Sequence, residues 1–163
     1  MAIKEILLIG DPRLLNVSAP VENIAANQTF LKELYQDMND SMKHYGGVGI
    51  AAPQIGVGIR VILFGFEKNL RYPNEAAIPE TFLINPTYTP LSEETESYLE
   101  GCLSVPELRG NVRRFIHIRY EGYSLDNKKI ERTVSGFHAR IIQHECDHLD
   151  GILFPSKIDK LEI

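Results

Sequence analysis

The sequence has no excess of basic residues. Its 163 residues include 17 lysines and arginines against 22 aspartates and glutamates, which gives a formal net charge of -5. Proteins that bind nucleic acid directly usually gather positive charge on one face. The composition therefore argues against nucleic acid as a direct partner.

Long apolar stretches are also missing. No run approaches the roughly 18 residues that a membrane-spanning helix needs. The apolar stretch near the N-terminus is interrupted by Glu5 and by the turn signal Asp11-Pro12, and it has no small-residue cleavage site of the kind that ends a signal peptide. We expect a cytoplasmic protein that does not contact the membrane.

Cysteine is scarce, since Cys102 and Cys146 are the only two. Without an export signal, two thiols are better interpreted as free or metal-bound than as a disulfide. Hydrophobic residues at 44% and charged residues at 24% are ordinary for a globular protein. A chain of this length forms about one domain, and we expect residues 1–163 to form a single catalytic domain.

Local patterns predict two helices among several strands. Apolar residues recur at helical spacing between Gln28 and His44, and a second helix is predicted from Gly136 to Leu149, with Ser135 as its N-cap. Period-two patterns and turn residues predict strands at 60–66, 81–86, 113–124 and 128–134. Residues 4–9 should form an edge strand or turn, and 97–107 an extended segment broken at Gly101 and Pro106. The order lacks alternating β-α-β units, so it favours an α+β domain.

The second predicted helix carries the strongest chemical signal. His144, Glu145 and His148 form a His-Glu-x-x-His motif, and residues four apart project to the same side of a helix. Two core histidines with backbone partners are the alternative interpretation. Two buried imidazoles without a metal would leave several polar atoms to satisfy, so a metal site is favoured.

Two histidines do not complete a catalytic metal centre, which needs three protein ligands and one open position. Zinc endopeptidases of the metzincin type place the third ligand where this chain has Phe154, so the third ligand should lie upstream of the motif. Cys146 lies about 200° around the helix from His144 and should pack into the core. Cys102 follows a glycine in a short extended segment and is the better candidate, although spacing alone leaves that assignment open.

A glycine-rich stretch precedes these elements. Gly47, Gly49 and Ala52 fit the dinucleotide-binding pattern G-x-G-x-x-A, but that pattern must follow a strand and open a helix. Here the pattern follows a predicted helix, and Pro53 argues against a second helix directly after it. We interpret the stretch as a loop that lets the backbone approach a ligand, with Gln54 as an amide donor.

Three segments, taken in order, resemble the signature motifs of the peptide deformylase family. They read GVGIAAPQ (47–54), EGCLS (100–104) and QHECDHLDG (143–151), and they match every fixed position of G-x-G-x-A-A-x-Q, E-G-C-x-S and Q-H-E-x-D-H-L-x-G. The resemblance implies antiparallel β-sheets around a central helix that carries the His-Glu-x-x-His motif. It also implies one divalent metal ion on Cys102, His144 and His148, usually Fe²⁺, with Zn²⁺, Ni²⁺ or Co²⁺ able to replace it.

The resemblance further implies hydrolysis of the N-formyl group of N-formylmethionine on newly made polypeptides at the ribosome, with release of formate. The metal would lower the pKa of its bound water, and Glu145 would act as general acid and base. Gln54 and the backbone N–H of Leu103 would stabilise the oxyanion. Substrate contacts are expected from Val48, Gly49, Glu100, Arg109, Phe137 and Ile141.

Some of these expectations have plain alternatives. Glu100 and Arg109 are equally suited to structural ion pairs, and Phe137 and Ile141 to the helix core. The loop 67–80 could border the substrate groove, but its composition does not decide this. A zinc endopeptidase would leave Cys102 unused, and a non-catalytic metal-binding domain would not need Glu145.

Overall fold

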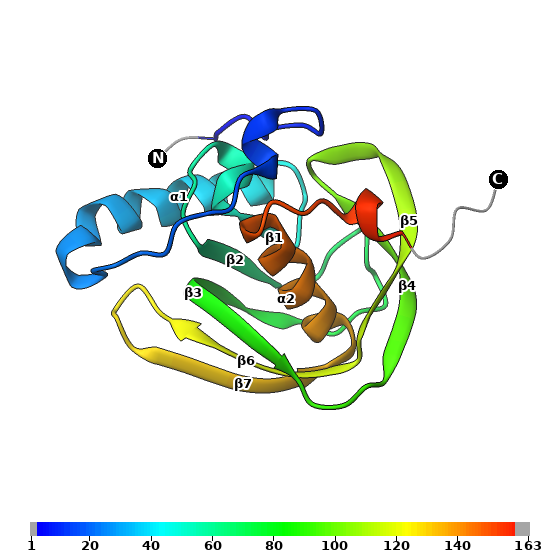
Figure 1. Ribbon diagram of the computed structural model, residues 1–163. Helices are drawn as coiled ribbons and strands as arrows, with labels where there is room; N and C mark the ends of the chain where they lie inside the picture. The colour runs from blue at the N-terminus through cyan, green and yellow to red at the C-terminus, as the bar shows by residue number, and fades with distance from the viewer. Residues whose placement is uncertain (1–2, 159–163) are drawn as a thin grey trace.

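The computed structural model describes residues 3–158 (Figure 1). Its α-helices are α1 (Gln28–His44) and α2 (Gly136–Leu149). Its strands are β1 (Gly49–Ala51), β2 (Val61–Phe66), β3 (Ile78–Pro90), β4 (Thr95–Cys102), β5 (Val105–Phe115), β6 (His117–Tyr123) and β7 (Lys129–Ser135). Short 3-10 helices lie at η1 (Pro12–Leu15), η2 (Ala25–Asn27), η3 (Ala52–Ile55) and η4 (Phe154–Lys157). No helix in the described part of the chain is long and apolar enough to cross a membrane.

The strands form two antiparallel sheets. Five of them pair in the order β1-β2-β3-β6-β7, while β4 and β5 form a separate hairpin. In Figure 1, α2 lies in the middle of the molecule, between the five-stranded sheet and the β4–β5 hairpin. This arrangement confirms the α+β class with antiparallel sheets.

The five-stranded sheet is covered on both faces. Side chains alternate between the faces of a strand, so Val61 and Leu63 pack in the cluster that contains α1, while Ile62 and Phe64 pack in the cluster that contains α2. This explains why β2 is an unbroken apolar run: a strand buried on both faces has no polar side.

Both predicted helices have the predicted bounds, and their ends follow from local chemistry. After α1, Gly46 adopts φ +72°, and the N–H of Gly47 donates to the carbonyl of Met42 at 2.9 Å, as in a glycine-terminated helix. Ser135 occupies the N-cap position of α2, but its side chain makes no capping hydrogen bond. The predicted N-cap position is therefore confirmed without the capping hydrogen bond, and Ser135 is also the last residue of β7.

The strand prediction fails where the chain changes sheets. The segment 113–124 is divided, because β5 ends at Phe115 and β6 begins at His117; the alternation continues through the corner and gives no sign of it. The break within 97–107 lies at Leu103-Ser104, a two-residue hairpin turn, and Pro106 sits inside β5. Both strands of a two-stranded sheet have a free edge, where proline removes no ladder hydrogen bond.

Residues 4–9 form no strand. The N–H of Leu7 donates to the carbonyl of Gln54, and that of Ile9 to the carbonyl of Ser104, each at 2.8 Å. The segment therefore contacts both η3 and the turn of the β4–β5 hairpin instead of pairing along one strand. These two elements contain residues of the first two sequence motifs.

Candidate active site

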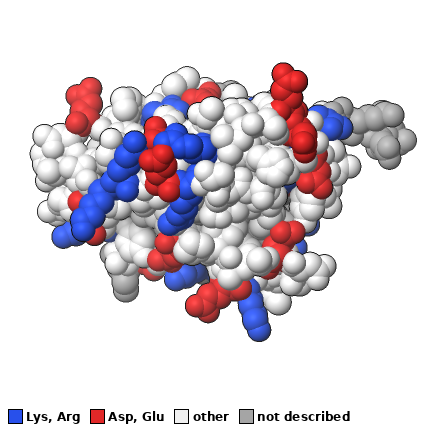
Figure 2. Space-filling view, turned by 90° about the horizontal axis from the view of Figure 1, so that it is seen from below, with Lys and Arg blue, Asp and Glu red and all other residues white. Residues whose placement is uncertain are grey.

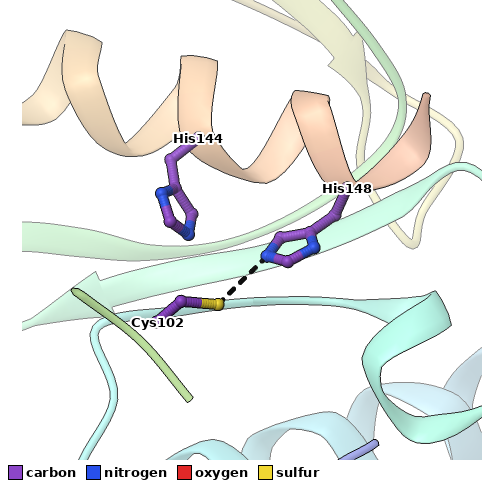
Figure 3. Close-up of side chains that lie close together, drawn as sticks. All are labelled: Cys102, His144 and His148. Carbon is purple, nitrogen blue, oxygen red and sulfur yellow. Dashed lines mark hydrogen bonds between the residues drawn. The ribbon is translucent and has the colours of Figure 1, made fainter. Parts of the chain in front are cut away.

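The two histidines of α2 and the cysteine of β4 meet inside the molecule. In Figure 3, His144 and His148 point from α2 toward Cys102. The Cys102 Sγ lies 3.3 Å from Nε2 of His148, and the candidate ligand atoms of the three residues all lie within 4.8 Å of one another. Cys102 is the last residue of β4, so the tight turn that follows it holds the thiol against the helix.

The orientation of His144 is fixed by a carboxylate. Its Nδ1 lies 2.8 Å from Oε1 of Glu100, which leaves Nε2 free to face the cluster. Metal-binding histidines commonly donate their other N–H to a carboxylate in this way. One thiolate and two imidazoles suit divalent transition metals, so the residues present fit such an ion.

The electrostatics of the cluster favour the thiolate form of Cys102. Burial raises the pKa of the Cys102 thiol, but the neighbouring His148 and His144 outweigh it and hold that pKa well below its ordinary value. Burial lowers the pKa of His144, while its hydrogen bonds to Cys102 and Glu100 raise that pKa well above the ordinary value. The thiolate is the form of cysteine that binds metals.

Glu145 lies beside the three residues and has an unpaired oxygen. Its Oε1 is buried and has no hydrogen-bond partner among the described residues. A Cβ at Gly49 would lie 2.7 Å from its Oε2, so the glycine of β1 leaves room for the carboxylate. Burial raises the pKa of Glu145, and the nearby His144 and His148 oppose that rise. A carboxylate of this kind can take up a proton and return it.

The side-chain amide of Gln54 is fixed by hydrogen bonds beside the turn of the β4–β5 hairpin. Its Oε1 accepts from the N–H of Ala51 at 2.9 Å, which fixes the amide orientation. Its Nε2 donates to Oγ of Ser104 at 3.0 Å and to Sγ of Cys102 at 3.6 Å. The first two motifs are therefore joined through one side-chain amide. The side chain of Leu103 reaches the glycine loop as well, since a Cβ at Gly47 would lie 2.8 Å from its Cδ1.

A pocket of about 50 Å³ opens at these groups. Among the expected substrate residues, Val48, Gly49, Glu100, Phe137 and Ile141 line it. Arg109 does not; it lines a neighbouring hollow.

Sequence comparisons place the chain among known proteins. The family model described as polypeptide deformylase matches residues 3–163. The chain belongs to this family. It is 55% identical to peptide deformylase 1 of Bordetella pertussis over 98% of this chain and 89% of the relative. It is 51% identical to peptide deformylase 2 of Pseudomonas putida over 96% of this chain and 88% of the relative.

Solved structures of deformylases have the same fold. A class I type b peptide deformylase from Acinetobacter baumannii, in a crystal structure with Met-Ala-Ser bound, has a TM-score of 0.91 and 37% identity, covering 96% of this chain and 99% of that one. The peptide deformylase of Thermotoga maritima has a TM-score of 0.84 and 32% identity over 98% of this chain and the whole of the other.

The structure also brings in residues that no deformylase motif predicts. Arg71 and Tyr72, from the loop between β2 and β3, line the pocket, and the ring of Tyr72 lies 4.7 Å from that of Phe137. The loop therefore does border the pocket. It has no periodicity, and only its length and its position between two strands set it apart in the sequence.

Buried ion pairs hold Glu100, the carboxylate that orients His144. Glu100 accepts hydrogen bonds from Arg114 and Arg140 at 2.6 to 2.9 Å, and Arg114 also donates to Asp147 at 2.5 Å. The ion-pair interpretation of Glu100 is thus what the structure shows. Asp147 is a fixed position of the third motif. Arg114 lies on the same buried side of its strand as Val112. A charged residue on the apolar side of a predicted strand was the feature of the sequence from which a buried ion pair could have been predicted.

Proposed function

We propose that this chain is a metal-dependent deformylase that removes the N-formyl group from the initiator N-formylmethionine of newly made polypeptides and releases formate. The observation that carries the proposal is the convergence of Cys102, His144 and His148 at a pocket that Cys102, His144 and Glu145 line. Family membership supports the same reaction. The Acinetobacter relative binds Met-Ala-Ser, and a deformylated product likewise begins with a free methionine.

The three clustered residues are proposed to hold one divalent ion, with Fe²⁺ as the resident metal. When bound, such an ion supplies a Lewis acid and lowers the pKa of a coordinated water. The thiolate of Cys102 and the carboxylate partner of His144 give the site negative charge to balance the cation. Zinc, nickel or cobalt would fit the same donor atoms.

Glu145 is proposed to move the proton of the reaction. Its carboxylate takes a proton from the attacking water and delivers it to the amine as the formyl C–N bond breaks. The unpaired Oε1 supports this role, because it needs no existing hydrogen bond to be broken first. Burial raises the pKa of Glu145 toward neutral pH. A pKa near the working pH suits a group that must both take up and return a proton.

Gln54 and the backbone N–H of Leu103 are proposed to donate to the oxygen of the formyl group as negative charge develops on it. Both hydrogens on the Gln54 amide nitrogen point at the hairpin tip. The hydrogen that donates to the Cys102 sulfur lies nearer the proposed metal site, and it is the one that we propose turns to a substrate oxygen. Loss of one such donor typically costs about 100-fold or more in rate.

The pocket is proposed to hold the methionine side chain against Val48, Phe137 and Ile141. The strand β1 lies at the edge of its sheet, so its free backbone groups near Gly49 can pair with an extended peptide. Backbone pairing of this type tolerates many sequences, as a protein acting on many nascent chains requires. We propose that these chains are met at the ribosome in the cytoplasm and that residues 1–163 act as one catalytic domain.

The experiment is anaerobic purification with metal analysis, followed by assay of formyl-Met-Ala-Ser, acetyl-Met-Ala-Ser and internal peptide bonds. We expect formate release from the formyl peptide only. Glu145→Ala should retain the metal and lose the formate release. Cleavage of internal bonds with intact formyl groups would instead establish an endopeptidase.

A further inference from the structure

A second hollow adjoins the proposed substrate pocket at the β4–β5 hairpin tip. It measures about 230 Å³, and it shares Arg71 and the segment 101–103 with the first pocket. Its other lining residues include Tyr45 and Arg109. A molecule that leaves the first pocket along the hairpin tip therefore enters this hollow.

Two guanidinium groups border the hollow without ion-pair partners. Arg71 Nη2 donates to the carbonyl of Tyr45 at 3.5 Å, and the Arg109 guanidinium carbon lies 6.0 Å from the centre of the Tyr72 ring. Within residues 3–158, neither has a carboxylate partner. Both lie near Tyr72: burial raises the pKa of its hydroxyl, and the charges of Arg109 and Arg71 oppose that rise.

Arg132 also lacks a carboxylate partner among the described residues, but it donates to the hydroxyls of Thr81 and Tyr120. Five other arginines are paired with carboxylates, namely Arg13, Arg60, Arg114, Arg119 and Arg140. On the face shown in Figure 2, basic and acidic side chains lie next to one another. The described residues that line the hollow include no aspartate or glutamate. In a chain of net charge -5, this hollow has an uncompensated positive charge.

The proposed function places the reacting bond at Cys102 and the methionine side chain beside Phe137. An extended peptide advances about 3.3 Å per residue, so the second and third residues pass the hairpin tip where the two hollows share their lining. A carboxylate on either residue, or the terminal carboxylate of a tripeptide, then comes within reach of Arg71 and Arg109.

We propose that Arg71 and Arg109 form an anion subsite that favours formyl-methionyl peptides carrying a carboxylate at the second or third residue. The peptide direction in this proposal rests on the proposed function. Both arginines are exposed, so each contact is screened by water, and the expected preference is roughly 2- to 5-fold in kcat/KM.

The test compares matched amidated peptides, formyl-Met-Glu-Ser against formyl-Met-Gln-Ser and formyl-Met-Ala-Glu against formyl-Met-Ala-Gln. We expect a higher kcat/KM for each glutamate peptide at low salt, and a ratio that falls toward one at high salt. The free acid of formyl-Met-Ala-Gln separates the terminal carboxylate from a side-chain carboxylate. A wild-type ratio near one for both pairs and for the free acid would overturn the subsite.

Variants then locate the charge. The glutamate-to-glutamine ratio should fall to about one in the double variant Arg71→Gln/Arg109→Gln, and should persist in Arg71→Lys/Arg109→Lys. Lys32→Gln removes an equal charge from the exposed side of α1 and should leave the ratio as in the wild type. A ratio that survives in the double glutamine variant contradicts the proposal.

Failure of the proposed function is a separate outcome. If the wild-type protein released no formate from any of these peptides, the function would be wrong, and the subsite would still be measurable. Calorimetry with the unformylated amides Met-Glu-Ser and Met-Gln-Ser reports the same charge preference as a ratio of Kd values. Equal Kd values would reject the subsite on their own.

Discussion

Gly49 is the residue at which the backbone of β1 comes closest to the proposed proton carrier. A methyl group there would meet the Glu145 carboxylate, at 2.7 Å from Oε2 and 3.2 Å from Cδ. Glu145 is buried and has little room to withdraw, so Gly49→Ala should displace the carboxylate. We expect formate release to fall about 100-fold, as for a catalytic group moved by about an ångström, with metal content unchanged.

The control is Gly58→Ala, because a Cβ at Gly58 meets no atom within 4 Å. This variant should keep wild-type kcat. Gly49→Ala with full activity would mean that Glu145 can shift without loss, which would contradict its assignment as the proton carrier.

The two cysteines should respond differently to the same substitution. Cys102 lies within reach of both histidines, so Cys102→Ser should lose most of the metal, which metal analysis after dialysis can measure. Cys146 packs in the apolar cluster around Tyr120 and Ile142, and burial raises the pKa of its thiol. Cys146→Ser should retain the metal and lose about 1–3 kcal/mol of stability, because it buries a hydroxyl in that cluster. The opposite pattern of metal loss would overturn the ligand assignment.

Residue-level prediction from the sequence depended on motifs. His144 and Glu145 stood in a helical motif that by itself indicated a metal site, whereas Cys102 was assigned only through the resemblance to a family, and the structure brings Cys102 and His144 together. Arg71 and Tyr72 stood in a loop without a pattern, and they reach the pocket only because β2 and β3 place that loop over it. No local rule of sequence carries this information, since it depends on how distant strands pair.

At the level of elements, a polar contact between His138 and Tyr120 joins α2 to the five-stranded sheet. Nε2 of His138 lies 2.8 Å from the Tyr120 hydroxyl, and that hydroxyl also accepts from Nη1 of Arg132 at 2.9 Å. A neutral imidazole with an unprotonated Nε2 accepts the proton that this hydroxyl can donate. Burial, and then the charge of Arg132, lower the pKa of His138 from 6.5 to about 4.

The stability of the protein should therefore depend on pH between 6.5 and 4. In that interval the unfolded chain binds a proton at His138 that the folded chain does not, so the free energy of unfolding should fall as the pH falls from 6.5 to about 4. Chemical denaturation of wild type and His138→Gln across this range measures the effect. The variant should show a shallower slope, whereas substitution of the exposed His117 should not change it. Parallel slopes for wild type and His138→Gln would refute the link.

Helices were more predictable than strands for a physical reason. The helix α1 buries one side against the sheet, so its apolar residues follow a single period. The helix α2 is buried all round from Ala139 to Leu149, and the residues at its two ends marked its bounds in the sequence. The strands bend, and β5 passes into β6 at Ile116 without a change in alternation. A corner between sheets leaves the side-chain pattern intact and changes only which backbone groups are paired, so the sequence showed one strand where the structure has two.

At the scale of the whole molecule, the proposed metal site would join two elements that are distant in the sequence. Cys102 belongs to the β4–β5 hairpin, and His144 and His148 belong to α2. A bound ion would therefore fasten the hairpin to the helix, in addition to the buried ion pairs of Arg114 with Asp147 and of Glu100 with Arg140. A ligand that binds only the folded chain stabilises it by RT ln(1 + [L]/Kd). This is about 2.7 kcal/mol when the free ligand concentration is 100 times Kd.

Removal of the metal should therefore lower the thermal stability of the entire chain. For a protein of this size, about 2.7 kcal/mol corresponds to a decrease in Tm of about 5–10 °C, which differential scanning calorimetry can measure before and after chelation under anaerobic conditions. Re-addition of Fe²⁺ or Zn²⁺ should restore the Tm. Cys102→Ser should begin near the lower Tm and respond little to chelator, because its site already binds the ion weakly, while Cys146→Ser should respond as the wild type does. An unchanged Tm after verified metal removal would show that the protein's own ion pairs and hydrogen bonds between the hairpin and the helix suffice without the ion.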